Sequence, residues 1–224
     1  MSFSLRHCRN SIVFGAGHGI GLAFVEYMLT NHPTLTVMAT YRSEDKASEL
    51  FKCQERYPKR LIIKNLDPTL ESDIKRAYEE CIESGISFDL IINSVGLLHK
   101  NQIQPEKSLR TFEEDHFMEI MKVNCIVTPL IAKYFEKLIN KESQSAFISL
   151  SAKVGSISDN RMGGWYSYRA SKAALNMLIK TISIEYSRKK IKWNGFSYSS
   201  RNDKELIISP HSFERTNYIL PEAH

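Results

Sequence analysis

Short apolar runs alternate with longer amphipathic segments along most of this chain. The runs read as buried strands, and the longer segments carry apolar residues at helical spacing. In residues 70–84, for example, Ile74, Ala77, Tyr78 and Cys81 fall on one helical face. This alternation predicts an α/β fold, with a parallel sheet covered by helices on both faces. The expected strands are residues 11–14, 35–41, 61–64, 88–92 and 146–151, and the expected helices are residues 22–29, 43–56, 70–84, 116–138 and 167–187.

The regular pattern stops after residue 187. Residues 188–192 are basic, and no clear apolar strand or helix follows them. We therefore expect one α/β domain over residues 1–187 and an atypical tail over residues 188–224. Pro129 falls inside the expected helix 116–138 and predicts a kink there.

A glycine-rich turn joins the first expected strand to the first expected helix. Glycines at such a turn let a pyrophosphate approach backbone N–H groups at a helix N-terminus. Strand, turn and helix stand in the order that a Rossmann fold requires, so the turn predicts dinucleotide binding. A glycine-rich turn without a ligand is the alternative. The predicted contacts are Gly15, Gly17, His18, Gly19, Ile20 and Gly21.

Arg42 follows the second expected strand, where a dinucleotide-binding fold meets the adenosine ribose. An acidic residue there would bind the 2′-hydroxyl of NAD, whereas a guanidinium favours the 2′-phosphate of NADP. We therefore expect NADP(H) to be preferred over NAD(H), with His18 assisting. The alternatives are a solvated arginine and a histidine that only shapes the turn.

Tyr168 and Lys172 lie four residues apart, which places them on one face of a helix. A lysine ammonium next to a tyrosine favours the phenolate and would lower its pKa from about 10. That pair suits acid–base chemistry on a carbonyl or an alcohol. An ordinary surface pair on an amphipathic helix is the alternative. Tyr166 lacks a lysine four residues later, because position 170 is Ala.

Taken together, these motifs resemble those of the short-chain dehydrogenase/reductase family. The likeness covers about residues 10–187, and residues 155–176 look closest to the C-factor (C-signal) and sniffer-like carbonyl reductase branch. The matching features are the Gly15–Gly21 turn, Asn93-Ser94-Val95-Gly96, Asn124, a serine at the end of the fifth strand, and Tyr168 with Lys172.

The resemblance implies hydride transfer between a nicotinamide cofactor and a small carbonyl or alcohol. Tyr168 would exchange the proton, and Lys172 would hold the nicotinamide ribose. Asn124 would support a water that relays protons to Lys172, although a helix-stabilising amide is the alternative. Ser151 would hydrogen-bond the substrate oxygen. Asp67 would lie by the adenine, with Asn93 and Gly96 beside the adenosine ribose.

Three departures from the family pattern stand out. Phe14 replaces the usual threonine before the glycine turn. Counting back from Gly155 places the catalytic serine position on Ala152, so the choice of Ser151 leaves the register open. The tail lacks the Pro-Gly that ends the family's sixth strand, and we expect incomplete C-terminal strands.

The abrupt end of the pattern suggests a reading-frame change shortly after Ser187. Residues 197–202 can be encoded so that the shifted frame reads His-Thr-His-Pro-Gly-Thr, which supplies the missing motif. The rival to an active enzyme is therefore a nucleotide-binding or signalling protein with weak or no turnover.

Composition excludes several other classes. The net charge of +5 is spread along 224 residues without a nucleic-acid motif, so no nucleic acid is expected. No apolar run approaches the length of a membrane helix, so no membrane partner is expected. Cys8, Cys53, Cys81 and Cys125 form no CxxC or metal pair, which favours reduced thiols in the cytoplasm and no metal site.

The resemblance also implies a homodimer or tetramer built from the helices that carry Asn124 and Tyr168. Apolar residues of these helices could serve either the core or that interface. They are Ile120, Val127, Ile131, Leu175, Leu178 and Ile182.

Overall fold

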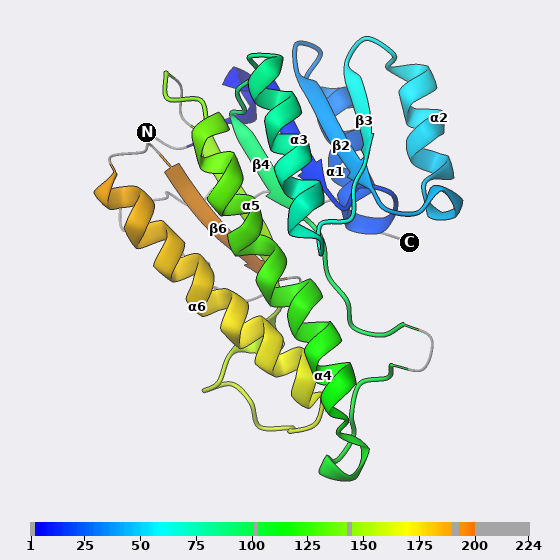
Figure 1. Ribbon diagram of the computed structural model, residues 1–224, viewed down its shortest axis with the longest axis vertical. Helices are drawn as coiled ribbons and strands as arrows, with labels where there is room; N and C mark the ends of the chain where they lie inside the picture. The colour runs from blue at the N-terminus through cyan, green and yellow to red at the C-terminus, as the bar shows by residue number, and fades with distance from the viewer. Residues whose placement is uncertain (1–2, 101–102, 143–144, 190–192, 200–224) are drawn as a thin grey trace.

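A six-stranded parallel sheet forms the centre of the protein, in the order β3-β2-β1-β4-β5-β6. A computed structural model describes residues 3–100, 103–142, 145–189 and 193–199 (Figure 1). The order steps outward from β1 in both directions, as in a doubly wound fold. The strands are β1 (Asn10–Phe14), β2 (Thr36–Tyr41), β3 (Leu61–Asn65), β4 (Leu90–Asn93), β5 (Ser145–Ser151) and β6 (Trp193–Ser199).

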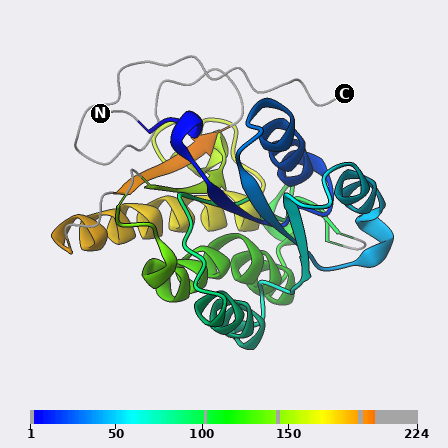
Figure 2. The same cartoon turned by 90° about the horizontal axis from the view of Figure 1, so that it is seen from above.

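Helices cover both faces of the sheet, which gives the three expected layers (Figure 2). The α-helices are α1 (Gly19–Asn31), α2 (Ser48–Arg56), α3 (Glu71–Glu83), α4 (Glu114–Met121), α5 (Val127–Phe135) and α6 (Tyr166–Arg188). The shorter helices are η1 (Leu5–His7), η2 (Glu44–Lys46), η3 (Leu109–Thr111), η4 (Lys122–Ile126), η5 (Glu136–Leu138) and η6 (Lys153–Gly155).

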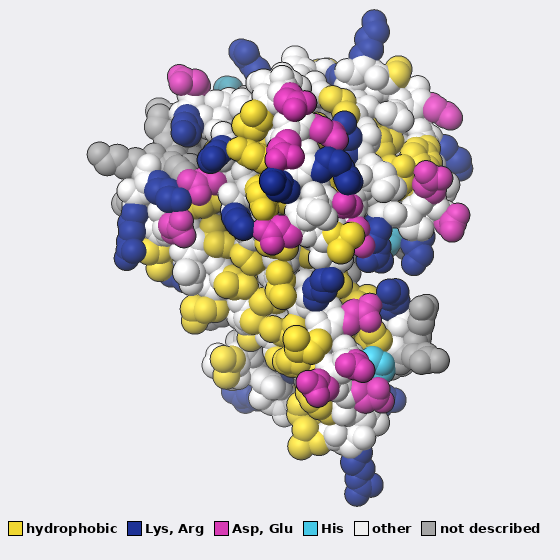
Figure 3. Space-filling view, in the orientation of Figure 1, with side chains coloured by type: hydrophobic (Ala, Val, Ile, Leu, Met, Phe, Trp, Pro, Cys, Tyr) yellow, Lys and Arg dark blue, Asp and Glu magenta, His cyan; other side chains and the backbone are white. Residues whose placement is uncertain are grey.

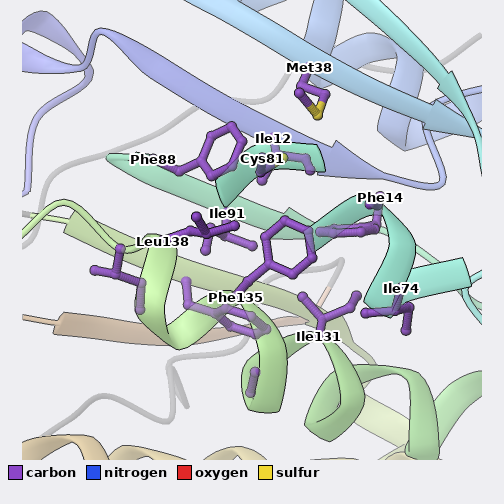
Figure 4. Close-up of a cluster of buried hydrophobic side chains, with 14 of the residues drawn as sticks. Ile12, Phe14, Met38, Ile74, Cys81, Phe88, Ile91, Ile131, Phe135 and Leu138 are labelled. Atoms are coloured by element: carbon purple, nitrogen blue, oxygen red, sulfur yellow. The ribbon is translucent and has the colours of Figure 1, made fainter. Parts of the chain in front are cut away.

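Alternate residues of each strand enter two separate cores, because side chains of a strand point to opposite faces. Val13 packs with α1 and α2, whereas Ile12 and Phe14 pack with α3 and α5. Phe14 is fully buried, and its ring meets the Phe135 ring edge-on at 5.1 Å (Figure 4). Such a pair adds about 1 kcal/mol beyond its buried area. The phenylalanine that departs from the family pattern therefore serves the core.

The expected helix 116–138 is divided into segments. α4 passes into η4, a π-helical turn, before α5 and η5 follow. Pro129 lies in α5, so the irregular turn begins before the proline. A π-turn shifts the side chains that follow it around the helix and is frequent at functional sites. Here it carries Asn124.

The start of the predicted tail is part of the sheet. β6 runs parallel to β5 with seven paired residues, from Ser145 with Trp193 to Ser151 with Ser199. The backbone thus supplies a sixth strand where we expected pattern loss. Residues 190–192 and 200–224, which hold the rest of the predicted tail and the site of the missing Pro-Gly, lie outside the described residues.

All four cysteines are free and buried. Burial raises the pKa of the Cys8 thiol to about 12 and that of Cys81 to about 11, so neither forms a thiolate readily. Within the described part of the chain, no helix is long and apolar enough to cross a membrane.

Candidate active site

The glycine turn is built by close backbone packing. A Cβ on Gly21 would lie 2.3 Å from the Gly15 carbonyl oxygen and 2.4 Å from Ser94 Oγ, so α1 can approach β1 only with glycine at this position. Gly19 has a φ of +61° but no atom within 4 Å of its Cβ position. Gly21 therefore serves packing, whereas Gly19 provides a backbone shape and an open surface.

The N-terminus of α1 faces this turn. His18 is its N-cap residue, and its side chain makes no capping hydrogen bond. The first N–H groups of the helix are therefore left for a ligand, and the positive end of the helix dipole favours an anion. A cleft of about 260 Å³ opens here, and its walls include all six predicted residues of the turn.

The far end of the cleft is basic. Arg42 and Lys46 both line it, at the end of β2 and in the following η2. Arg42 Nη1 lies 4.0 Å from Asp67 Oδ2, an exposed pair that contributes little stability and leaves the guanidinium available. Asp67 itself is absent from the cleft walls, but Leu66, Pro68 and Thr69 line them. Sequence reasoning missed Lys46, which lies four residues after Arg42 at the end of η2.

Asn93 has a different place from the one expected. Its side chain is buried and donates to Thr128 Oγ1 at 2.9 Å, while its Oδ1 accepts the Val95 N–H. Asn93 thus stabilises the end of β4 from inside the protein, and it does not line the cleft. The neighbouring Ser94 does line the cleft and donates to the Phe14 carbonyl at 2.6 Å.

Tyr168 and Lys172 lie one turn apart in α6, as predicted. Lys172 Nζ sits 5.6 Å from the centre of the Tyr168 ring and donates to the Leu150 carbonyl at 2.9 Å. The backbone of Lys172 packs against Gly155, where a Cβ would come within 2.8 Å. The lysine is therefore held tightly between β5 and η6.

The pKa values correct one expectation. Burial raises the pKa of Tyr168, opposite to the lowering expected from Lys172. Burial also lowers the pKa of Lys172 to about 8, because desolvation disfavours the ammonium. In this state Tyr168 is protonated at neutral pH and is ready to donate a proton.

Asn124 is buried in the π-turn and makes three hydrogen bonds. Its amide donates to the Leu97 carbonyl at 2.8 Å and to Ser171 Oγ at 3.0 Å, and its Oδ1 accepts the Leu97 N–H at 2.6 Å. The side chain thereby joins α6 to the segment after β4. This places Asn124 next to the tyrosine–lysine pair, as the resemblance implied.

Ser151 does not join this group. Its hydroxyl donates to Asn176 Oδ1 at 2.6 Å, one turn beyond Lys172 and two turns beyond Tyr168. Strand alternation turns residue 151 toward the body of α6, and Ala152 takes the next position at the end of the strand. The Ser151 hydroxyl is thus paired with Asn176 in this structure, and its contact with the substrate oxygen stays a prediction.

Gly96 connects the cleft to Asn124 and Lys172. It lines the cleft, and a Cβ at this glycine would lie 3.7 Å from both Asn124 Oδ1 and Lys172 Nζ. Lys100 and Glu119, which sequence reasoning missed, pair at 3.2 Å on the same wall. Neither residue belongs to a sequence motif, so only the tertiary structure shows that they line the cleft.

No group of histidine, cysteine or acidic residues in the described ranges could hold a metal ion. The donors around Tyr168 are instead a phenol, an amine and an amide. These groups fit a ribose and a carbonyl, and the glycine turn fits a pyrophosphate.

Comparison with known families decides the classification, since the short chain dehydrogenase family matches residues 9–198. The chain belongs to the short-chain dehydrogenase family. A family member from Schizosaccharomyces pombe, an uncharacterized oxidoreductase, is 30% identical over 183 residues, which cover 79% of this chain and 68% of that protein. Benzil reductase of Bacillus cereus is 26% identical over 182 residues, with 79% and 68% covered.

Solved structures of the family share this architecture. A short-chain dehydrogenase/reductase from Burkholderia multivorans with bound NADP has a TM-score of 0.72 and 26% identity, covering 84% of this chain and 77% of that one. The carbonyl reductase Sniffer of D. melanogaster has a TM-score of 0.73 at 22% identity, covering 83% and 78%. The latter likeness supports the fold alone.

Proposed function

We propose that this short-chain dehydrogenase is an NADP(H)-dependent reductase of carbonyl compounds. The observation that carries the proposal is the place of Gly96, which borders both the glycine-turn cleft and the Asn124–Lys172 group. A dinucleotide whose pyrophosphate lies at Gly15–Gly21 would therefore extend toward Tyr168. When bound, the nicotinamide supplies the hydride.

The side chains of this protein would manage the proton. Tyr168 donates its phenolic proton to the carbonyl oxygen, and its raised pKa keeps that proton in place at neutral pH. Lys172, with a pKa lowered to about 8, can then restore the proton to the phenolate. Asn124 Oδ1 would orient a water on the path from solvent to Lys172.

Cofactor choice would be set at the basic end of the cleft. Arg42 and Lys46 offer two positive charges to a 2′-phosphate, with no described carboxylate closer to Arg42 than Asp67 at 4.0 Å. The relative with bound NADP supports the same preference. We assign NADPH as the preferred cofactor, with Gly96 beside the adenosine ribose and Asp67 by the adenine.

The substrate would be small and at least partly apolar. The Trp165 ring meets the Tyr168 ring nearly at right angles, with centres 6.2 Å apart, and stays partly exposed. An aromatic wall next to the proton donor favours an aromatic or aliphatic carbonyl over a charged one. The similarity to benzil reductase supports this class.

The test is whether the purified protein oxidises NADPH or NADH in the presence of aldehydes, quinones or aromatic diketones. The loss of absorbance of the reduced cofactor measures the reaction. We expect turnover with apolar carbonyls and a lower KM for NADPH than for NADH. Binding of NADPH without oxidation by any of these compounds would contradict the reductase and favour the second candidate.

The second candidate is a nucleotide-binding protein of C-signal type with weak turnover. The position of Ser151 favours it, because its hydroxyl, proposed to hold the substrate oxygen, donates to Asn176 Oδ1 instead. Ala152→Ser would restore a hydroxyl at the register given by Gly155. A rise in turnover in that variant supports weak catalysis by the natural chain, whereas no change means that Tyr168 needs no serine.

A reading-frame change after residue 187 remains our proposal for the unusual tail. The sixth strand at Trp193–Ser199 pairs along its full length with β5, so any such change would have to preserve a strand there. Sequencing the gene and translating the shifted frame tests it. A shifted frame without Pro-Gly and without a further apolar strand and helix would end this proposal.

We also propose a homodimer or tetramer. Ile120, Val127, Ile131 and Leu175 are buried and belong to the core, so they are not available for an interface. Hydrophobic side chains gather instead over the outer surface of α4, α5 and α6 (Figure 3). The exposed large hydrophobic residues described in these helices and η4 are Met118, Ile126, Tyr166, Met177 and Ile184. Light scattering at micromolar concentration tests the assembly, and a monomeric mass would refute it.

A further inference from the structure

A buried carboxylate outside the motifs lies close to the proposed proton donor. Glu106 belongs to the segment between β4 and α4, and only 4% of it is exposed. In the described part of the chain, no lysine, arginine or histidine forms an ion pair with it. A buried charge without a cation needs other compensation, or its burial is costly.

The compensation comes from the N-terminus of α6. Ser167 donates both its N–H and its hydroxyl to the Glu106 carboxylate, with the N–H 3.3 Å from each oxygen. The backbone carbonyl of Glu106 accepts the Trp165 N–H. Trp165 is the N-cap residue of α6 but has no side-chain oxygen, so Glu106 performs the capping from 61 residues earlier in the chain.

The turn that Glu106 holds is conformationally unusual. Gly163 and Gly164 have φ near +65°, and Trp165 follows with +53°, the one positive φ among the described residues other than glycine. A Cβ on Gly164 would lie 3.2 Å from the Glu106 carbonyl oxygen. The two glycines adopt a positive φ readily, but Trp165 carries a Cβ, and its left-handed conformation is unfavourable without outside support.

We propose that Glu106 is a positioning residue that sets the place of Tyr168. Glu106 holds Ser167, which directly precedes Tyr168, and Trp165, whose ring packs against the tyrosine ring. The proposal rests on the assigned role of Tyr168 as proton donor. Without Glu106 the first turn of α6 loses its cap, and the phenol moves from its site beside Lys172. The rest of α6 stays packed through the buried side chains of Leu175 and Ile179.

Four variants separate positioning from general stability. Glu106→Ala removes the acceptor, and Glu106→Gln keeps an oxygen for the Ser167 N–H and an amide that can donate to its hydroxyl. Ser167→Ala removes the hydroxyl alone. Glu114→Gln makes the same charge change at an exposed site in α4 and serves as the matched control.

The first measurement is kinetic and is made well below each unfolding midpoint. Glu106→Ala should lower kcat by about tenfold to a hundredfold, as small misplacements of reacting groups do, with the KM for NADPH unchanged. Glu106→Gln should recover most of the loss, Ser167→Ala should show a smaller loss, and Glu114→Gln should match the natural chain. An unchanged kcat in folded Glu106→Ala, or a loss confined to KM, would overturn the proposal.

The second measurement does not depend on turnover. The phenol of Tyr168 is titrated by ultraviolet difference, with Tyr168→Phe as the blank, and amide exchange is followed at Trp165 and Ser167. In Glu106→Ala the raised pKa of Tyr168 should fall toward its ordinary value, and both amides should lose protection. If the natural chain reduces no carbonyl, the proposed function fails while this measurement still decides the role of Glu106. An unshifted titration with retained protection would refute it.

Discussion

The glycine turn and the tyrosine group form the two halves of one site, but they are built in opposite ways. The turn uses one continuous stretch of backbone, from Gly15 to Gly21, and it works through the absence of side chains. The tyrosine group uses side chains from the segment after β4, from η4 and from α6. Its long-range hydrogen bonds join residues 22 to 61 positions apart, from Lys172 with Leu150 to Ser167 with Glu106.

This difference predicts how each half tolerates change. A site built from backbone loses its ligand affinity when a new side-chain atom collides with the turn, and the structural change stays near that turn. A side-chain group fails when any member loses a partner, because buried polar groups depend on one another. The halves meet at Gly96, so nucleotide binding and proton transfer should be separable by mutation.

The largest expected effect separates the halves at Tyr168. Tyr168→Phe removes the proposed proton donor, and kcat should fall by about a hundredfold or more. The turn is untouched, so the dissociation constant for NADPH should stay within about twofold of the natural value. Stopped-flow kinetics and fluorescence titration measure the two quantities. Retained activity would remove Tyr168 from the proposed reaction.

The second effect concerns the turn alone. Gly21→Ala places a Cβ 2.3 Å from the Gly15 carbonyl oxygen, so α1 must shift, which costs about 1–3 kcal/mol and weakens nucleotide binding. Gly19→Ala is the matched control, because its Cβ meets no atom and only its positive φ is strained. Chemical denaturation and NADPH titration compare them. Equal losses in both variants would show that collision is not the cause.

A smaller effect is expected in stability at Lys172. The pKa of Lys172 is lowered to about 8 in the folded chain, so between that pH and about 10.5 the unfolded chain binds more protons. The free energy of unfolding therefore rises with pH across this window. Lys172→Met lacks the buried charge and should be more stable by about 2 kcal/mol below pH 8, after losing the bond to Leu150.

The control for that prediction is the pH profile itself. The advantage of Lys172→Met should shrink as pH rises from about 8 toward 10.5, because the natural lysine becomes neutral in both states. Thermal unfolding at several pH values measures this. A constant difference across the window would mean that desolvation of the ammonium is not its source.

The smallest effect is expected at the exposed end of the cleft. Arg42→Asp should weaken NADPH binding about tenfold and leave NADH binding nearly unchanged, because solvent screens an exposed charge pair. Lys46→Ala should change the preference in the same direction. Dissociation constants for both cofactors decide the case. Equal affinities for NADPH and NADH in the natural chain would show that neither Arg42 nor Lys46 recognises the 2′-phosphate.

Local signals account for much of what the sequence predicted correctly. The strands, the glycine turn and the Tyr168–Lys172 pair are short-range patterns, and the parallel sheet covered by helices followed from the alternation of strands and helices. The burial of Ile74, Ala77 and Cys81 follows from helical spacing in the same way. The hydrogen-bond partners of Ser151 and Asn93 could not be predicted in this way, because they come from distant segments. The hydroxyl of Ser151 faces Asn176, and the side chain of Asn93 lies under the turn.

The sequence by itself determined the glycine turn, because glycine spacing acts first through the conformation of a continuous stretch of backbone. The tertiary structure alone decided the environment of Tyr168, the proposed proton donor. Burial in the packed fold shifts the pKa values of Tyr168 and Lys172, and the π-turn directs Asn124 between Leu97 and Ser171. Glu106 reaches α6 for the same reason, since desolvation and long-range hydrogen bonds exist only after distant segments have packed together.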